Sequence, residues 1–116
     1  MTIKLYGLKN CDGCRKALKT LAARGDAVEF HDIREPANTE KVVNWIGATD
    51  DPLRFVNKRS TTWRALSNND KESLDALTAL PLLLKNPTLI KRPVLRIGEQ
   101  TLAGFDAARI DAAKLK

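Results

Sequence analysis

The residues whose types and spacing best support chemistry are the two cysteines, which form the motif Cys11-Asp12-Gly13-Cys14. A thiolate at the start of a helix faces unpaired backbone N–H groups and the positive end of the helix dipole, so its pKa falls. A second cysteine about one helical turn later can attack a disulfide that forms at the first. The motif therefore predicts that Cys11 is an exposed nucleophile and that Cys14 is the thiol that resolves its mixed disulfides.

Two other interpretations of this motif remain open from the sequence. A Cys-x-x-Cys pair is half of a tetrahedral zinc site, but His31 is the only histidine, so one chain supplies at most three soft ligands and would need a second copy. The cysteines also fit two inert, buried residues. His31 itself is expected to be an exposed strand residue, and any Ser–His–Asp or Cys–His–Asn arrangement would need it as the base. We therefore expect no metal ligands and no bound cofactor.

A strand and a helix are expected to hold the cysteines in place. Residues 3–8 alternate apolar and polar side chains, which is typical of a short strand. From Asp12 onward apolar residues recur at spacings of three and four, which predicts an amphipathic helix that ends near Gly25. Asn10 or Cys11 would be its N-cap. A Cys-x-x-Cys motif at such a strand-to-helix turn points to a thioredoxin-like redox site.

The rest of the sequence predicts an α/β domain with an irregular, polar middle. A strand at residues 28–33 would complete a βαβ unit with two parallel strands. The helix at 39–46 would be capped by Asn38 or Thr39 and stop at Gly47. The further elements are expected in this order: short helices around 63–66 and 70–77, an apolar helix at 74–84 that Pro81 breaks or kinks, a strand at 94–97, a turn at Gly98-Glu99, a returning strand at 100–103, and a helix through Ala113 capped by Asp106. No linker or repeat interrupts the chain, so a single domain over residues 1–116 is expected.

Pro93 lies at the start of one of these predicted strands, directly after Arg92. A proline cannot donate a hydrogen bond to a neighbouring strand, so its presence there needs a reason. In thioredoxin-like architecture this place holds a cis proline beside the active cysteine, and an edge-strand proline is the simpler alternative. Arg92 would present its guanidinium to an anion or to the Cys11 thiolate, unless it is an ordinary exposed arginine.

The charge distribution favours an anionic ligand. The chain carries 20 basic and 14 acidic residues, a net charge of +6, and the excess lies in two blocks, residues 1–24 and 57–98. Aromatic residues make up only 5% and no dense Lys/Arg run occurs, so a small anion or an acidic protein fits these blocks at least as well as a nucleic acid. We expect no direct nucleic-acid binding. The expected substrate-binding residues are Lys9, Asn10, Arg15 and Arg59.

The sequence shows no sign of export or membrane insertion. No run approaches the ~20 apolar residues that a membrane span needs. The first ten residues, MTIKLYGLKN, lack the apolar stretch of a signal peptide. We therefore expect a cytoplasmic protein without a membrane partner.

A family resemblance is carried by three segments, Tyr6–Cys11 (YGLKNC), Arg59–Arg64 (RSTTWR) and Pro87–Val94 (PTLIKRPV). Together they resemble the ArsC family, which comprises glutaredoxin-linked arsenate reductases, Spx transcription regulators and small YffB-like proteins. The last two segments are most similar to the YffB-like branch, and the resemblance spans nearly the whole chain. It implies an α/β, thioredoxin-like fold with a helical insert at about residues 48–86.

The resemblance also implies roles for residues named above. Cys11 would be the family's nucleophile, Pro93 its cis proline and Arg92 its anion-contacting arginine. Arsenate reductases of the family place three arginines around the anion, whereas only Arg92 is matched here. Asn57 and Gly104 occupy the other two positions. This departure weakens the expectation of arsenate reduction.

The second cysteine separates the branches further. The family's arsenate reductases lack a counterpart of Cys14 and pass arsenic to external glutathione. Spx-type regulators carry the Cys-x-x-Cys pair as a redox switch and bind RNA polymerase through the insert, but a glycine used in that contact falls on Asp51 or Pro52 here. We expect a thiol-dependent reductase: a thiol–disulfide oxidoreductase that uses Cys11, Cys14 and glutathione as co-substrate. The alternatives are a redox-sensing regulator that binds RNA polymerase and an arsenate reductase that depends on glutaredoxin.

Overall fold

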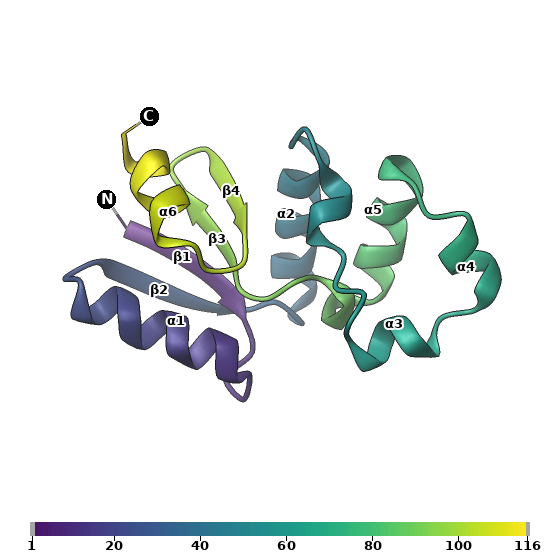
Figure 1. Ribbon diagram of the computed structural model, residues 1–116, viewed down its shortest axis with the longest axis horizontal. Coiled ribbons are helices and arrows are strands. Elements are labelled where there is room, and N and C mark those ends of the chain that lie inside the picture. Colours follow the sequence, from purple (N-terminus) through teal and green to yellow (C-terminus); the bar gives the residue numbers. More distant parts are fainter. Residues whose placement is uncertain (1, 116) are drawn as a thin grey trace. The chain divides into compact units, whose positions relative to one another are not determined.

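Segments near both ends of the chain build one unit of the structure, and the helices between them build another (Figure 1). The computed structural model describes residues 2–115. The first unit combines Met1–Ile33 with Arg92–Lys116, and the second is Arg34–Lys91. That the two form a single domain stays a prediction. No helix within residues 2–115 has the length and apolar character needed to span a bilayer.

The first unit holds a four-stranded sheet in the order β2-β1-β3-β4. Its strands are β1 (Thr2–Gly7), β2 (Ala27–Asp32), β3 (Val94–Ile97) and β4 (Gln100–Ala103). β1 and β2 run parallel, as the predicted βαβ unit requires, and β3 and β4 form the predicted antiparallel hairpin beside β1. The register places Tyr6 opposite His31 on one side and opposite Val94 on the other.

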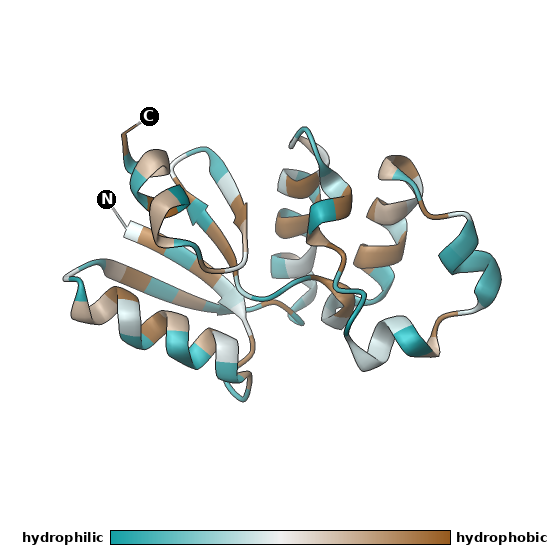
Figure 2. Cartoon of the chain, viewed as in Figure 1, coloured by the Kyte–Doolittle hydropathy of each residue, from teal (hydrophilic) through white to brown (hydrophobic). Residues whose placement is uncertain are grey.

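One face of this sheet is covered by α1 (Asp12–Ala23) and α6 (Ala107–Lys114). Figure 2 shows hydrophilic and hydrophobic residues interspersed along α1, and its buried residues, Cys14, Ala17 and Leu21, recur at spacings of three and four, as in an amphipathic helix. The buried side chains that join the two helices to the sheet are Ile3, Leu5, Cys14, Ala17, Leu21, Leu95, Ile97, Ile110 and Ala113. The second cysteine of the motif is therefore a member of this core.

The ends of both helices follow from local chemistry. Cys11 is the N-cap of α1, one of the two predicted N-cap residues. The chain leaves α1 through Gly25, whose φ of 83° lies in the region that favours glycine. Asp106 caps α6, as predicted, because its Oδ1 accepts a hydrogen bond from the backbone N–H of Arg109 at 3.2 Å.

The second unit is helical. Its elements are α2 (Pro36–Gly47), the short 3-10 helix η1 (Pro52–Phe55), α3 (Thr61–Ala65), α4 (Asn68–Glu72), α5 (Ala76–Lys85) and the 3-10 helix η2 (Pro87–Leu89). Because α2 packs against α5 and η1, this unit begins earlier than the insert that the sequence predicts at about residues 48–86. A β-bridge joins Val56, which directly follows η1, to Ile90, which directly follows η2.

The start of α2 differs from the prediction. The helix begins at Pro36 with Glu35 as N-cap, whereas Asn38 or Thr39 was expected there. Proline is well tolerated at the first helical position, where its missing N–H has no helical partner. Thr39 lies inside the helix, and its hydroxyl donates back to the Glu35 carbonyl at 3.1 Å. The predicted stop at Gly47 is confirmed.

The helices of residues 68–85 also divide differently. The expected helix at 70–77 does not form, since α4 ends at Glu72 and a new helix starts at Ala76. Asp75 causes the new start, because its side chain accepts the backbone N–H of Leu77 at 2.9 Å and that of Thr78 at 2.8 Å. α5 then continues through Pro81 instead of breaking there. The carbonyl that Pro81 leaves without a helical donor belongs to Leu77, which is 80% exposed, so water can replace the lost bond.

Candidate active site

The turn between β1 and α1 presents the first cysteine. The backbone N–H of Cys11 donates to the Leu8 carbonyl at 3.2 Å, which closes this turn. Cys11 has extended backbone angles, φ −91° and ψ 122°, as an N-cap residue does, and its carbonyl accepts the N–H of Arg15 at 3.0 Å. Its side chain is half-buried. The prediction that the first thiol lies at the helix start, within reach of solvent, fits this geometry.

The second cysteine is enclosed. Cys14 has no solvent exposure and packs in the core beneath α1. Its sulfur lies so close to the backbone of Gly7 that a Cβ at this position would collide with it. Gly7, at the end of β1, therefore provides the space for the buried thiol. A glycine inside an alternating strand is a signal that another group approaches the backbone closely, so the sequence contains a signal for this role of Gly7.

Several groups act on the pKa of Cys11. Burial raises it, but the backbone N–H and the thiol of Cys14 and the guanidinium of Arg92 lower it more, so the net pKa lies below the usual value. The sulfur makes no regular capping hydrogen bond, yet the Cys14 N–H is near enough to favour the charged form. The Arg92 side chain contributes both a hydrogen bond and a positive charge. These groups favour the thiolate form of Cys11.

The pKa of Cys14 moves in the opposite direction, to about 11. Burial is the largest cause, and the hydrogen bond to Cys11 and the charge of Cys11 raise it further. A backbone hydrogen bond from Leu8 and the charge of Arg92 oppose this rise without cancelling it. The Cys14 thiol thus donates to the Cys11 sulfur, and of the two thiols Cys11 is the one that loses its proton first as the pH rises.

Arg92 and Pro93 reach the same edge of the sheet as the thiols. Because Tyr6 on β1 pairs with Val94 on β3, the residues before Val94 lie beside the end of β1 and the turn to α1. The Arg92–Pro93 peptide bond is cis, as the family resemblance implies. Pro93 is buried, and its carbonyl accepts the N–H of Gly104 at 2.8 Å. The two predicted residues are therefore brought to the site by strand pairing.

The predicted substrate-binding residues fall into two groups. Lys9, Asn10 and Arg15 surround the turn, all exposed, and Arg15 donates through Nε to the Lys9 carbonyl at 2.7 Å. Arg59 belongs to the second unit, where its backbone N–H donates to Asn57 Oδ1 at 3.1 Å. The role of Arg59 in a substrate site stays a prediction.

His31 makes more side-chain contacts than the sequence indicates. It was expected to be exposed, but its ring stacks on Tyr6 with centroids 4.9 Å apart, and its Nε2 lies 3.3 Å from Glu29 Oε1. The side chain is 31% exposed. The stack follows from the parallel register, which places Tyr6 beside His31 and which no local sequence pattern reveals. Within residues 2–115 no three His, Cys, Asp or Glu side chains gather as metal ligands.

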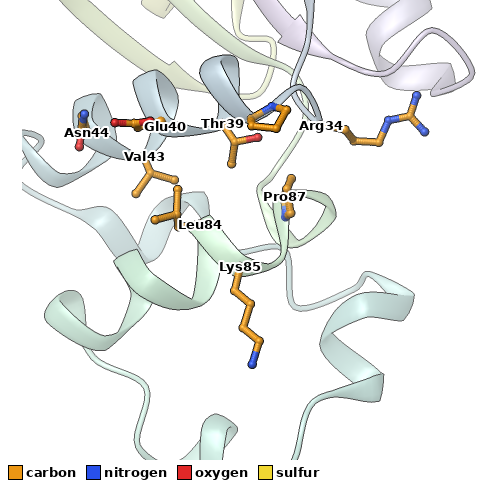
Figure 3. A pocket seen from close by; sticks show the side chains of 9 residues that line it. Arg34, Thr39, Glu40, Val43, Asn44, Leu84, Lys85 and Pro87 are labelled. Carbon is orange, nitrogen blue, oxygen red and sulfur yellow. The ribbon is translucent and has the colours of Figure 1, made fainter.

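The second unit has a hollow of its own (Figure 3). It is lined by Arg34, Pro36, Thr39, Glu40, Val43, Asn44, Leu84, Lys85 and Pro87. Val43 and Leu84 point toward each other, whereas the Lys85 side chain extends away from α2 (Figure 3). This lining contains one carboxylate and neither a thiol nor an imidazole, so it lacks the residue type that carries the chemistry at the β1–α1 turn.

The chain is similar to several known proteins over nearly its whole length. Sequence relatives include an uncharacterised protein of Haemophilus influenzae, 42% identical over 96% of this chain and 97% of the relative. The global transcriptional regulator Spx of Streptococcus agalactiae is 28% identical over 95% of this chain and 81% of its own. The solved structure of the YffB protein is 36% identical and covers 96% of this chain and 97% of that one, with a TM-score of 0.81. The likeness to the YffB-like branch is thereby confirmed.

These relatives establish the fold and the broad kind of chemistry. The neighbouring structures, which also include a protein related to arsenate reductase, are α/β proteins of the ArsC, thioredoxin-like type. Together with the Spx relatives they support a thiol-dependent redox function. The model of the ArsC family matches residues 6–113, which include both thiols and Arg92. The chain belongs to the ArsC family.

Proposed function

We propose that the chain is a thiol–disulfide oxidoreductase that uses Cys11 as nucleophile, Cys14 as resolving thiol and glutathione as co-substrate. The observation that supports this most directly is the asymmetry of the pair. Cys11 is half-buried with a lowered pKa, while Cys14 is fully buried with a pKa of about 11. Two inert cysteines that were both buried, the structural alternative, would both have raised pKa values.

In the first step the Cys11 thiolate attacks one sulfur of a disulfide, such as oxidised glutathione. A bond forms between the Cys11 sulfur and that sulfur, the disulfide bond breaks, and the other half leaves as a thiolate. Arg92 favours the reactive thiolate, and the cations Lys9 and Arg15 provide a field that suits the carboxylates of glutathione. The solvent-facing position of Cys11 lets the substrate approach.

In the second step Cys14 attacks the Cys11 sulfur. The Cys11–Cys14 disulfide forms, and the second glutathione leaves as a thiolate that takes up the proton lost by Cys14. The first step prepares this one, because the negative charge on Cys11 raises the pKa of Cys14 and disappears when the mixed disulfide forms. Two external thiols then reduce the internal disulfide and are themselves oxidised, which returns the pair to its starting state.

The experiment that tests the proposal is intact-mass analysis after exposure to oxidised glutathione. The wild-type chain should accumulate the internal disulfide, a loss of two hydrogens. Cys14→Ser should stop at one bound glutathione, because Cys11 still reacts and nothing resolves it. Cys11→Ser should bind none, because Cys14 is shielded and holds its proton.

The same chains also show which outcomes would contradict the proposal. If Cys14→Ser traps no glutathione and the wild-type chain forms no internal disulfide, the Cys-x-x-Cys pair is structural and the proposal fails. If Cys11→Ser binds glutathione as readily as Cys14→Ser, the nucleophile is wrongly assigned. A cytoplasmic location is part of the proposal, since a reducing compartment keeps the pair ready to react.

A redox-sensing regulator is the second candidate. It is favoured by the match to Spx over 95% of the chain and by the hydrogen-bonded thiol pair, which would serve as a switch. The test is a binding measurement with purified RNA polymerase, using the oxidised and the reduced chain in parallel. Binding that changes with oxidation, without turnover of a disulfide substrate, would favour this candidate over the oxidoreductase.

Arsenate reduction, with glutaredoxin as the electron donor, receives less support from the geometry. The position at which the family's arsenate reductases carry a third arginine is Gly104, whose φ is 76°, a conformation that an arginine adopts only under strain. Asn57 occupies the second arginine position and accepts the N–H of Arg59 within its own turn. A single arginine, Arg92, remains for the oxyanion. Assay of arsenate reduction with glutathione and glutaredoxin tests this alternative.

A further inference from the structure

Helix α1 carries a strip of positive charge that begins beside Cys11. Arg15 and Leu18 follow Cys11 by four and seven residues, so they share its side of the helix. Lys19 follows Arg15 by four residues, and Lys16 flanks both. We name this set the α1 basic strip: Arg15, Lys16, Leu18 and Lys19, which line an open hollow on the surface.

The lysines of this strip have no acidic partner. Within the described chain, no carboxylate pairs with Lys16 or Lys19. The other end of α1 is different, because Arg24 pairs with Asp26 and Asp111. Asp12 is the one carboxylate on α1, so the positive charge near Cys11 is offset only in part and by no ion pair to Lys16 or Lys19, whereas Arg24 at the far end is paired within the unit.

Within the α1 basic strip, a hydrogen bond holds Arg15 in place and Leu18 provides an apolar surface. The Nε of Arg15 is held by the Lys9 carbonyl at 2.7 Å, which fixes the guanidinium over the turn that leads to Cys11. Leu18 is half-buried and packs against the core, so its remaining surface lies between the cations. A ligand that fits here carries carboxylates together with an apolar side chain.

We propose that the α1 basic strip docks an acidic peptide segment of a protein disulfide whose cysteine reacts with Cys11. The proposal rests on the proposed function and names the substrate class for that same thiol. Lys19 lies eight residues beyond Cys11, about 12 Å along the helix axis. An extended peptide covers this span in about three or four residues. The strip therefore selects carboxylates three or four residues from the reacting cysteine, a separation that a small oxyanion does not have.

The reaction follows the steps already given for glutathione. The Cys11 thiolate attacks one sulfur of the protein disulfide, and the other sulfur of that disulfide leaves as a thiolate. Cys14 then attacks the Cys11 sulfur and releases the docked cysteine, which takes up the proton lost by Cys14. The partner disulfide gains two electrons, and the Cys11–Cys14 pair supplies them and becomes a disulfide.

The test compares synthetic peptides with one cysteine joined through a disulfide to mercaptoethanol. The peptides differ only in the residues three and four positions away on both sides, which are glutamate, glutamine or lysine. Mass spectrometry of the Cys14→Ser chain, which retains its adduct, gives each rate constant. At low ionic strength the glutamate peptide should react about tenfold faster than the glutamine peptide, and the lysine peptide more slowly still. Added salt should remove most of this difference as it shortens the screening length.

Variants locate the effect on the helix. The double variant Lys16→Gln/Lys19→Gln, in the Cys14→Ser background, should lower the glutamate-to-glutamine ratio from about tenfold to about twofold. Lys4→Gln is the matched control, because Lys4 alternates with Ile3 and Leu5, which face α1, and so lies on the other face of the sheet. It should keep the ratio of the parent chain.

Three results would overturn the proposal. Equal rates for the glutamate and glutamine peptides would reject the docking surface while leaving the oxidoreductase function intact. A ratio that survives the double variant but disappears in Arg92→Gln would place the carboxylates at Arg92. If no peptide and no glutathione reacts with Cys11, the proposed function fails together with the docking surface.

Discussion

The two thiols of the site lie one helical turn apart and occupy opposite environments. Cys11 is at the open end of α1, where Arg92 and a backbone N–H lower its pKa. Cys14 is one turn further in, without solvent exposure, and its pKa is about 11. The residue type is the same, so the difference in pKa comes from position alone. A strand-to-helix turn thus lowers the pKa of one thiol, while burial raises that of its neighbour.

This asymmetry is not a fixed property of each side chain. The Cys14 thiol donates to the Cys11 sulfur, so each thiol contributes to the pKa of the other. When Cys11 loses its charge by forming a mixed disulfide, burial remains as the main cause that holds the proton on Cys14. Substitutions at the two thiols and beside them can reverse, weaken or separate these contributions.

The largest expected effect is in alkylation. Near neutral pH Cys11 should react with iodoacetamide at least about a hundredfold faster than Cys14, because the thiolate fraction of Cys14 is limited by its pKa of about 11. As the pH rises, labelling of Cys11 should level off below the usual thiol pKa, whereas labelling of Cys14 should still increase up to about pH 11. Both cysteines fall in one tryptic peptide, Asn10–Arg15, so fragment-ion mass spectrometry must separate them. Equal alkylation rates for the two thiols would show that Cys11 and Cys14 do not differ in reactivity.

The next largest effect concerns the space around each sulfur. Gly7→Ala would place a methyl group against the Cys14 sulfur and should lower the free energy of unfolding by about 2 kcal/mol, as measured by urea denaturation. It should also slow the formation of the internal disulfide, because the resolving thiol is displaced. Alkylation of Cys11 in the same variant should change little.

Gly13→Ala is the matched control for this substitution. Its methyl group would meet nothing nearer than the Cys11 sulfur at 3.9 Å, an ordinary contact, and alanine is the better helix former. The free energy of unfolding should stay the same or rise by up to about 1 kcal/mol. The double variant Gly7→Ala/Cys14→Ala should recover part of the loss of Gly7→Ala. If the Gly7→Ala chain is as stable as the Gly13→Ala chain, the close approach between β1 and Cys14 does not affect the free energy of unfolding.

A smaller effect is expected from the charge beside Cys11. Arg92→Gln removes a hydrogen bond and a positive charge from the thiolate, so the pKa of Cys11 should rise. Alkylation near neutral pH should slow about tenfold, and Arg92→Lys, which keeps the charge, should slow it less. Arg96→Gln is the control, since Arg96 lies four residues further along the chain, on β3, and donates to Thr101 Oγ1 at 2.7 Å. An equal slowing in Arg96→Gln would mean that the effect is only one of net charge.

The sequence predicts the elements around the thiols better than those of the second unit. The alternation of β1 and the three- and four-residue spacing of α1 are local patterns, and Gly25 and Asp106 mark helix ends through their own chemistry. These signals act within a few residues, so one sequence is enough to find them. The position of Cys11 at the helix start could be predicted for the same reason.

The features that the sequence does not reveal depend on contacts between distant segments or on competition between two possible helix patterns. The stack of Tyr6 on His31 needs the parallel register, and the role of Gly7 needs the depth of Cys14 beneath α1. In the second unit the capping side chain of Asp75 ends one helical pattern and starts another, although the apolar spacing alone allows both. Arg59 could be proposed from the sequence only through a resemblance, and the structure gives it local contacts in the second unit.

The smallest expected effect concerns the influence of Cys11 on the pKa of Cys14, on which the second step of the proposed reaction depends. Cys11→Ala removes both the hydrogen-bond acceptor and the charge that raise the pKa of Cys14, so this pKa should fall below about 11. It should remain above the ordinary thiol value of about 8.5, because burial, the largest cause, is unchanged. Titration of the thiolate absorbance in the single-cysteine chain measures it directly.

Cys11→Ser provides the graded comparison. Its hydroxyl oxygen still accepts the hydrogen bond of Cys14 but carries no charge, so the pKa of Cys14 should lie between those of the alanine variant and the wild-type chain. Such an order would assign part of the shift to the charge that a mixed disulfide removes, which is the contribution that prepares Cys14 for attack. If the pKa of Cys14 stays at about 11 in both variants, burial alone sets it, and the resolving thiol must be freed by movement of α1 rather than by loss of the charge on Cys11.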